Sequence, residues 1–293
     1  MNLFHAILLG LIQGLTEFLP VSSTAHLTLA EHLMFHGHPM PLAFDVLLHV
    51  GTLGALMVYF RRELVQVFMG CLGRDVEGRK LAWWLFLAMI PTGIFGLATR
   101  GVKEAAKEHL WVYGFGLVIT AALLYAANRI SQDRADQLGT DAAGRGIGDL
   151  KALDALAVGT IQGLGGGFGL SRSGSTIAMG VFRGLRLPDS TRFSFLLGMP
   201  TIAAAAVVEL RGLVKPLLKH QPLPADLAFP LGSASPALLC AAGILAAAIS
   251  GYLAIGLLDR FTRKPRLNGF AVYCLGMGLV MLTLGATGVL GHH

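Results

Sequence analysis

The chain contains 293 residues, of which 54% are hydrophobic and only 14% are charged, and its mean hydropathy is +0.64. Soluble domains carry about 25% charged residues, so this chain cannot cover a water-facing surface. A cytosolic globular enzyme, a disordered protein and a small secreted scaffold are therefore excluded. The net charge is +6, but the basic residues lie between apolar runs and are not interleaved with aromatic residues. No nucleic-acid partner is therefore expected. The composition predicts an all-α polytopic membrane protein.

Two kinds of apolar segment follow one another along the chain. Uninterrupted runs of about 17–25 residues can cross a bilayer. Two other stretches, 3–35 and 151–186, are broken by PVSST at 20–24 and by GGGFGLSRSGST at 165–176. Irregular backbone at membrane depth is tolerated only when it is buried in protein or lines a wet cavity, so both stretches are predicted to be re-entrant helical hairpins. Six transmembrane helices are predicted at 42–60, 82–99, 110–130, 192–210, 236–258 and 268–290.

The Lys and Arg residues predict the orientation of these segments. If each hairpin returns to its own side, sixteen of the 23 basic residues fall on one side, including those of 61–81, and six fall on the other. Basic loops stay in the cytoplasm. The side with sixteen is therefore predicted to be cytoplasmic, with both termini outside, the first hairpin entering from outside and the second from inside. The six outer residues are Arg100, Lys103, Lys107, Arg211, Lys215 and Lys219.

An internal repeat supports this layout. IQGL at 12–15 recurs at 161–164, an offset of 149, and the same offset places the first break over the second. Each half holds one hairpin and three crossings, and an odd number of crossings inverts the second half relative to the first. Residues 1–293 are thus predicted to form a single membrane domain of two inverted repeats, 1–130 and 151–290. In such folds the broken helices meet near the midplane and form the functional site.

Glu17 is the first candidate for that site. An ionised side chain inside an apolar helix costs several kcal/mol unless it is paired or hydrated, so a functional role is the default interpretation. Pairing with an arginine is the structural alternative, and Arg172 in the second break is available for it. Gln13 lies four residues before Glu17, on the same helix face, and is expected to contribute to substrate binding.

The PVSST break supplies hydroxyl groups and is followed by an imidazole. Pro20 stops the first helix, and Ser22, Ser23 and Thr24 are suitable N-caps for a second helix that contains His26. A hydroxyl three residues before a histidine matches the pattern of an activated nucleophile. Ser23 and His26 are therefore candidate catalytic residues, with either one as the nucleophile, and Ser22 and Thr24 are candidate substrate ligands, although capping alone is expected for at least one hydroxyl.

The second break combines flexible backbone with an anion-binding composition. Its glycines permit a tight turn, and Ser171, Arg172, Ser173 and Thr176 follow at the start of the next half-helix. Free N–H groups and the helix dipole favour an anion there, and the guanidinium of Arg172 offers bidentate phosphate contacts. These residues predict a phosphate site suited to cleaving a phosphoric anhydride. His49 either lines the same cavity or is a hydrogen-bonded structural histidine.

At these residues the sequence resembles the undecaprenyl-diphosphate phosphatases, the bacitracin-resistance proteins of bacterial plasma membranes. The family pattern of Glu or Gln, three residues, then Glu is matched by Gln13 and Glu17. Its PVSSTGH stretch appears as PVSSTAH at 20–26, and its PGxSRSGxT stretch appears as FGLSRSGST at 168–176. The two departures, Ala25 and Phe168, alter the backbone beside the proposed catalytic groups and not the groups themselves. The resemblance covers nearly the whole chain.

The resemblance implies an activity and a location. It implies removal of one phosphate from undecaprenyl diphosphate at the outer face of the bacterial plasma membrane, which recycles the lipid carrier for peptidoglycan synthesis and confers bacitracin resistance. It also implies a divalent cation, Mg²⁺ or Ca²⁺, between Glu17 and the phosphates. The expected partners are a polyprenyl diphosphate lipid and the bilayer. Prenyl chain length and oligomeric state are left open, a homo-oligomer being one alternative.

A secondary transporter or flippase of an anionic or lipid-phosphate substrate is the alternative function. Inverted repeats with broken helices are transporter architecture, and helix N-termini can hold a transported anion without cleaving it. Glu17, Ser23 and His26 favour the enzyme, because a carrier does not need a nucleophile and a base beside its anion.

Overall fold

A computed structural model describes residues 1–35, 42–102, 109–140, 143–166, 168–218, 235–264 and 266–287. These residues are helical apart from turns and one isolated bridge between Arg145 and Leu185. The helices are α1 (Leu3–Phe18), α2 (Ser23–Phe35), α3 (Leu42–Tyr59), α4 (Arg61–Cys71), α5 (Val76–Ala98), α7 (Leu110–Leu138), η1 (Ile147–Asp149), α8 (Ala152–Gly165), α9 (Arg172–Phe182), α10 (Leu187–Leu218), α11 (Pro236–Thr262) and α12 (Asn268–Thr287).

Five of the predicted spans coincide with helices that are long and apolar enough to cross a membrane, namely α5, α7, α10, α11 and α12. The end of the last predicted span, 288–290, lies outside the described residues. The remaining prediction, 42–60, is α3, which bends by 77° into α4 at Phe60 and counts as a sixth candidate only when the two are taken together.

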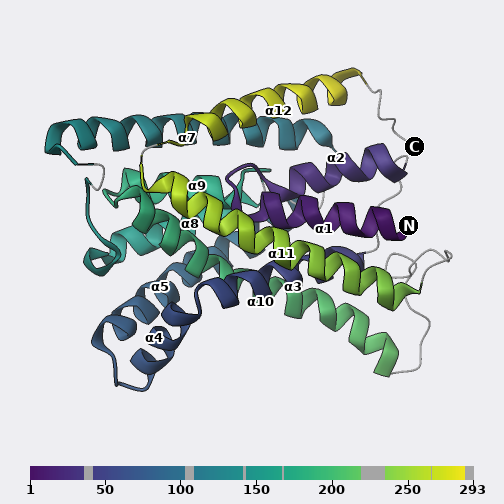
Figure 1. Cartoon of the computed structure of the whole chain (residues 1–293), viewed down its shortest axis with the longest axis horizontal. Coiled ribbons are helices and arrows are strands. Elements are labelled where there is room, and N and C mark those ends of the chain that lie inside the picture. The colour runs from purple at the N-terminus through teal and green to yellow at the C-terminus, as the bar shows by residue number, and fades with distance from the viewer. Residues whose placement is uncertain are drawn as a thin grey trace.

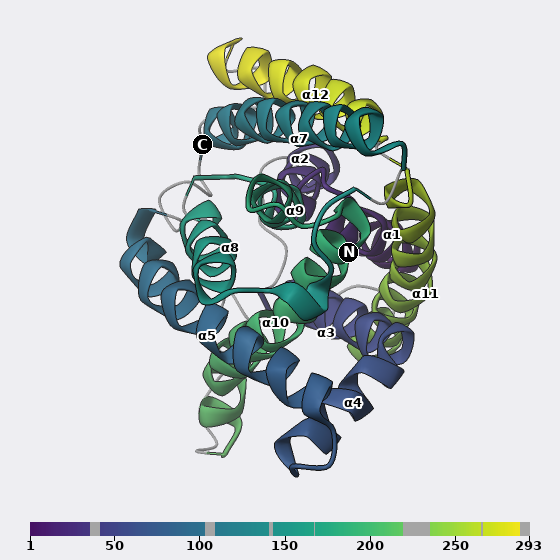
Figure 2. The ribbon, with the colours of Figure 1, turned by 90° about the vertical axis from the view of Figure 1, so that its left-hand side faces the viewer.

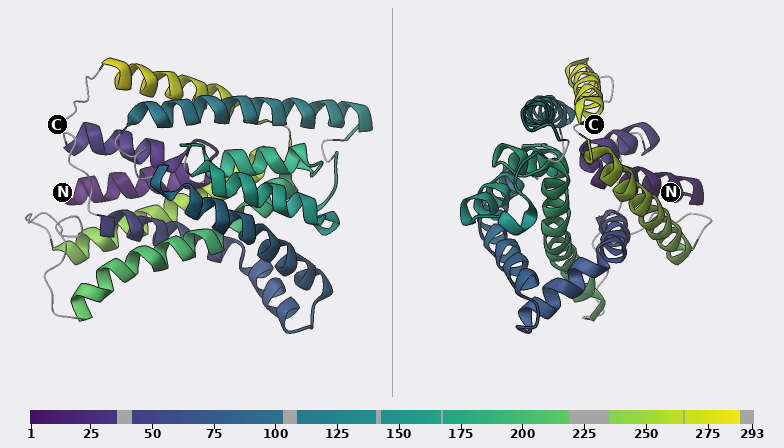
Figure 3. Two further views of the ribbon diagram at one scale, coloured as in Figure 1. Left: turned by 180° about the vertical axis from the view of Figure 1, so that it is seen from behind. Right: turned by 60° about the vertical axis from the view of Figure 1, so that its left-hand side comes forward.

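The segment after α3 differs from the prediction. Residues 61–81 were expected to form a loop, but they contain α4 and the beginning of α5, from Val76 onward. The two helices pack at very close range, because Gly70 lies against the backbone of Arg79 and Gly78 lies against that of Gln66. This tight antiparallel pair projects from the bundle at one side (Figures 1 and 3).

The two broken stretches form helical hairpins whose breaks lie where the sequence predicts them. Helix α1 ends at Phe18 and α2 begins at Ser23, while α8 ends at Gly165 and α9 begins at Arg172. Gly167, in the second break, lies outside the described residues. Figure 1 shows that α1 and α2 occupy one end of the bundle and α8 and α9 the other, so that the tips of the hairpins meet in the middle.

The longer helices surround these tips. Viewed along the bundle, α1, α2 and α9 lie in the middle, with α3, α5, α7, α10 and α11 around them and α12 outside α7 (Figure 2). The N-terminal end of α1 and the C-terminal end of α12 are at the same end of the molecule (Figure 1). The C-terminal ends of α7 and α11 lie at the opposite end of the molecule (Figure 1).

The repeated IQGL sequence has the same packing role in both halves. Gly14 of α1 lies against the backbone of Ala247 in α11, and Gly163 of α8 lies against the backbone of Thr92 in α5. Small residues allow helices in lipid to approach this closely. Each hairpin is therefore attached to one long helix from the other half of the chain, α1 to α11 and α8 to α5.

Aromatic packing fixes the end of α1. Phe18 is completely buried, and its ring contacts that of Phe195 edge to face at 5.7 Å between centroids. The Phe195 ring in turn meets that of Phe60 at 6.0 Å. This cluster joins α1, α10 and the bend after α3, and it holds the last turn of α1, which contains Glu17, in a fixed position.

Candidate active site

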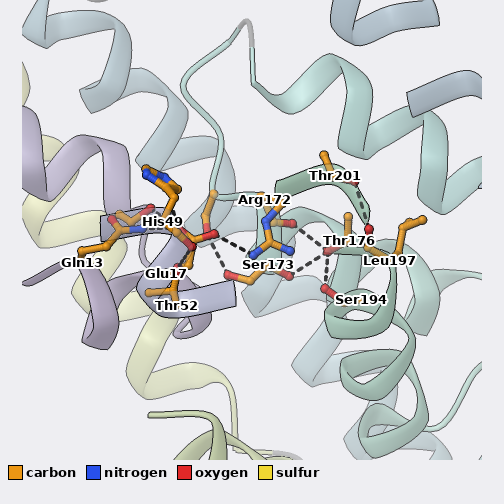
Figure 4. Close-up of polar contacts among 12 residues, drawn as sticks. Gln13, Glu17, His49, Thr52, Arg172, Ser173, Thr176, Ser194, Leu197 and Thr201 are labelled. Carbon is orange, nitrogen blue, oxygen red and sulfur yellow. Dashed lines mark hydrogen bonds and ion pairs between the residues drawn. The ribbon is translucent and has the colours of Figure 1, made fainter. Parts of the chain in front are cut away.

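Glu17 lies at the centre of a buried polar cluster between the two hairpin tips (Figure 4). Its Oε1 accepts a hydrogen bond from Nη2 of Arg172 at 2.9 Å. Its Oε2 accepts from the Ser23 hydroxyl at 2.6 Å and from Nε2 of Gln13 at 3.2 Å. Only 8% of Glu17 is exposed. The Glu17 carboxylate is thus paired with Arg172, as the structural alternative predicted, and it also accepts a hydrogen bond from the Ser23 hydroxyl.

The other half of the Arg172 guanidinium is unpaired within the part of the chain that the structure describes. Its Nη1 is buried and has no hydrogen-bond partner among the described residues. The guanidinium lies against Gly198 of α10, where a side chain would collide with Nη1. A buried donor without a partner costs about 1–3 kcal/mol. An oxyanion ligand would relieve that cost, so this side of the arginine is the natural place for a phosphate oxygen.

The backbone of the first break finds partners from several elements. The carbonyl oxygen of Leu19 accepts from the Ser173 hydroxyl at 3.1 Å, which links the two hairpin tips directly. The carbonyl oxygen of Pro20 accepts from Sγ of Cys274 at 3.2 Å. Ser22 has φ of +69°, an unfavourable backbone conformation for a residue with a side chain. Such strain concentrates at functional sites, where the surrounding contacts maintain it.

His26 does not form the expected contact with Ser23. Its Nδ1 lies 2.8 Å from the carbonyl oxygen of Ser22, and its Nε2 lies 2.7 Å from the Tyr273 hydroxyl. The Ser23 hydroxyl instead donates to Glu17. The spacing of three residues suggested a hydroxyl–imidazole pair, but the ring turns back onto its own helix and the serine turns toward the buried carboxylate.

His49 faces the cluster from α3. Its Nε2 is 3.9 Å from Oε2 of Glu17, and its Nδ1 contacts the carbonyl oxygen of Asp45 at 2.9 Å. Thr52, one turn further along α3, is completely buried, and its hydroxyl donates to the carbonyl oxygen of His49. The ring is therefore anchored on its own helix, and its Nε2 faces the Glu17 carboxylate.

The remaining predicted hydroxyl groups mostly satisfy backbone groups. The oxygens of Ser22 and Ser171 accept from backbone N–H groups in the first turns of α2 and α9, at 3.5 and 3.2 Å. Thr176 donates to the carbonyl oxygen of Arg172 at 2.7 Å, and its hydroxyl lies 2.6 Å from that of Ser194 (Figure 4). Thr176 thus connects the backbone of Arg172 to α10. Thr24 is half-buried in the first turn of α2 and takes part in none of these contacts.

Several residues that shape this site were not predicted from the sequence. Gly198, Ser194, Tyr273 and Cys274 lie in apolar spans and carry no motif of their own. Gly198 has one available signal, because the offset of 149 pairs it with His49. The first repeat thus carries an imidazole where the second carries the space that the Arg172 guanidinium needs.

The site offers few ligands for a divalent cation. Among the described residues no three His, Cys, Asp or Glu side chains gather in a way that could hold a metal ion. The available oxygens are the Glu17 carboxylate and Oε1 of Gln13, which is buried without a partner. A hard cation requires about six or more oxygens. These residues fit a cation that arrives with most of its ligands from a diphosphate and water.

The cluster combines groups that suit transfer of a phosphoryl group. A hydroxyl bonded to a carboxylate is a potential nucleophile with a proton acceptor. A guanidinium with one free edge can stabilise negative charge that develops on phosphate oxygens. The first residues of α2 and α9, Ser23 and Arg172, both contact Glu17, so the N-terminal ends of these helices meet there and their dipoles favour an anion.

Comparison with known proteins gives the same family over nearly the whole chain. The model of the family described as bacitracin resistance protein BacA matches residues 6–280. A protein named undecaprenyl-diphosphatase from Syntrophotalea carbinolica is 38% identical, covering 95% of this chain and 97% of its own. Proteins of the same name from Desulfosudis oleivorans and Thermomicrobium roseum are 38% and 37% identical, and each alignment covers at least 96% of both chains. The chain therefore belongs to the bacitracin resistance protein BacA family.

Proposed function

We propose that the protein is an integral membrane phosphatase that hydrolyses undecaprenyl diphosphate to undecaprenyl phosphate and inorganic phosphate. The observation that carries this proposal is the buried Nη1 of Arg172, unpaired among the described residues, beside the Glu17 carboxylate, which accepts a hydrogen bond from the Ser23 hydroxyl. The name of the relatives, undecaprenyl-diphosphatase, supplies the substrate. It also disfavours the transporter, because every relative described above is named as an enzyme.

The proposed reaction proceeds in two steps. The Ser23 oxygen attacks the terminal phosphorus, its proton passes to Glu17, and the bond from that phosphorus to the bridging oxygen breaks to release the lipid monophosphate. Water then attacks the phosphorus of the phosphoserine, and the bond from that phosphorus to the Ser23 oxygen breaks. Glu17 returns its proton to the serine oxygen, and both protons of the water leave with the inorganic phosphate. Arg172 stabilises the charge on the equatorial oxygens in both steps. His26 is the second candidate nucleophile, and Gln13, His49 and Ser173 border the substrate.

The proposal includes a membrane arrangement. We place α3, α5, α7, α10, α11 and α12 across the bilayer as the six spans, and the hairpins α1–α2 and α8–α9 as re-entrant elements of two inverted repeats, 1–130 and 151–290. The opposed hairpins in Figure 1 support this assignment. The uneven Lys and Arg distribution supports an inner α4–α5 end and an active site open to the outer face. Of the six outer basic residues, Lys103, Lys107 and Lys219 lie outside the described residues.

The biological role follows from that location. A phosphatase at the outer face of a bacterial plasma membrane would regenerate the carrier lipid for peptidoglycan synthesis. Bacitracin resistance would be a further consequence of this activity, in keeping with the family description. We further propose a dependence on Mg²⁺ or Ca²⁺, which Glu17 and Gln13 would help to hold. Such a cation would neutralise charge on the diphosphate oxygens.

The test is phosphate release from C55 diphosphate by the purified protein in detergent, with and without EDTA. We expect release by the unaltered chain, loss of release with EDTA, and recovery when Mg²⁺ or Ca²⁺ is restored. Arg172→Ala, which removes the guanidinium, is the inactive comparison. No release under any metal would refute the enzyme and favour the transporter, which flux measurements in vesicles would then detect.

A further inference from the structure

A tyrosine on the outermost helix holds the ring of His26. The Tyr273 hydroxyl lies 2.7 Å from Nε2 of His26, and the two rings stack with centroids 5.7 Å apart and an interplanar angle of 8°. The other ring nitrogen contacts the carbonyl oxygen of Ser22 at 2.8 Å. With both nitrogens bonded, the imidazole has a single orientation.

These partners determine which nitrogen carries the proton. A carbonyl oxygen only accepts hydrogen bonds, so Nδ1 of His26 must be the donor to Ser22. The neutral ring then has its lone pair on Nε2, and the Tyr273 hydroxyl donates to it. Without the tyrosine, Nε2 would have no partner among the contacts described for this ring.

The same helix is attached to the first break at a second point. The next residue, Cys274, is completely buried, and its Sγ donates to the carbonyl oxygen of Pro20 at 3.2 Å. Tyr273 itself is 45% exposed, so packing against its neighbours does not account for the position of its side chain. Helix α12 therefore contacts Pro20 in the break, before the strained Ser22, and His26 in α2, after it.

We propose that Tyr273 is a positioning residue for His26: its hydroxyl holds Nε2, which the contact of Nδ1 with the Ser22 carbonyl leaves unprotonated, as the atom through which the histidine acts. This inference rests on the proposed phosphatase function. Both roles open to His26 require that lone pair, since an imidazole attacks phosphorus or accepts a proton through an unprotonated nitrogen. The hydroxyl releases Nε2 when the substrate arrives, and it receives Nε2 again after the product leaves.

A double-mutant cycle tests whether Tyr273 acts through His26. Tyr273→Phe keeps the stacked ring and removes only the hydroxyl. We expect kcat to fall about tenfold with little change in KM, and we expect no further fall when the same change is made in His26→Gln. Tyr125→Phe, at a 60% exposed tyrosine of α7, is the matched control and should behave as the unaltered protein. Equal losses in both backgrounds, or no loss in either, would contradict the proposal.

A spectroscopic measurement gives an answer that does not depend on activity. The ¹⁵N resonances of His26, identified by their disappearance in His26→Gln, distinguish a protonated nitrogen from one with a lone pair. The unaltered protein should show a protonated Nδ1 and a hydrogen-bonded, unprotonated Nε2. In Tyr273→Phe the Nε2 resonance should move away from its hydrogen-bonded value. An Nε2 resonance that does not change would refute the positioning role, whereas a failure of the unaltered chain to release phosphate would refute only the phosphatase.

Discussion

Glu17 and Arg172 are 155 residues apart in the chain, and their side chains meet at 2.9 Å between the tips of two opposed hairpins. Removing two charges from water is costly, and a buried ion pair is often no more stabilising than apolar residues of similar volume. The pair is therefore weak evidence for stability and better evidence for function. Its geometry agrees with that interpretation, because the carboxylate also binds a hydroxyl while the guanidinium keeps one buried nitrogen without a partner.

The first prediction concerns the planar fork of Arg172. Lysine at this position keeps the charge but cannot bind Glu17 and a phosphate oxygen through two fixed nitrogens. We expect Arg172→Lys to lower kcat/KM at least tenfold, about 1.4 kcal/mol of transition-state stabilisation. Arg62→Lys, at an exposed position of α4, is the matched control. Steady-state phosphate release measures both, and near-normal activity of Arg172→Lys would place the phosphate site elsewhere.

The second prediction concerns the nucleophile. Because the Ser23 hydroxyl donates to Glu17 at 2.6 Å, we expect the two residues to act as a unit. Ser23→Ala and Glu17→Gln should each lower kcat by about a thousandfold or more, and the double variant should lose little beyond either one. Losses that simply add would show that the two residues act independently.

A phosphoenzyme trap distinguishes Ser23 from His26. Acid quenching of the enzyme with substrate labelled in its terminal phosphate should preserve a phosphoserine, which survives acid, and should destroy a phosphohistidine. We expect an acid-stable label that disappears in Ser23→Ala and persists in His26→Ala. A label that is stable only in alkali and disappears in His26→Ala would identify the histidine as the nucleophile.

The third prediction concerns the space beside Arg172. A Cβ at position 198 would collide with Nη1 of the guanidinium, so Gly198→Ala should displace the arginine from Glu17. Misplacement of a binding group by about 1 Å can cost a hundredfold in rate, and we expect a loss of about that size in kcat/KM. Alanine favours helix over glycine by about 1 kcal/mol, so the thermal midpoint should not fall by much. Gly276→Ala, which meets open space in α12, is the matched control and should be fully active.

Much of the fold could be predicted because the membrane restricts the solutions. Five predicted spans needed only the length of their apolar runs, and the two breaks needed only proline, glycine and hydroxyl residues at membrane depth. Helix α4 was missed because its eleven residues, RRELVQVFMGC, combine charges and apolar groups that read as a basic loop. Its stability derives from the close packing of Gly70 and Gly78 against α5 and α4, which no local pattern predicts.

The site was predictable where a charge stood out against an apolar background. Glu17 and Arg172 are both exceptions of this kind, and their pairing followed from the repeat. The partners of His26 could not be predicted in the same way, since Tyr273 is 247 residues away and lies in an ordinary apolar span. The sequence spacing suggested a hydrogen bond between Ser23 and His26. The Ser23 hydroxyl instead donates to the Glu17 carboxylate, a stronger acceptor than the imidazole.

The last prediction concerns the sidedness of the bundle. Sixteen basic residues on the α4–α5 side against six on the other indicate that this side is cytoplasmic. Cysteines placed at residue 76, at the start of α5, and at residue 292, beyond the described residues, should therefore react with a membrane-impermeant thiol reagent from opposite sides of the membrane. The background for this test replaces Cys71 and Cys240 with serine and keeps the buried Cys274, and it must retain activity. In intact cells we expect labelling at 292 only, and in inverted vesicles at 76 only. Labelling of both positions from one side would require an even number of crossings between them, which is incompatible with two opposed hairpins in inverted repeats.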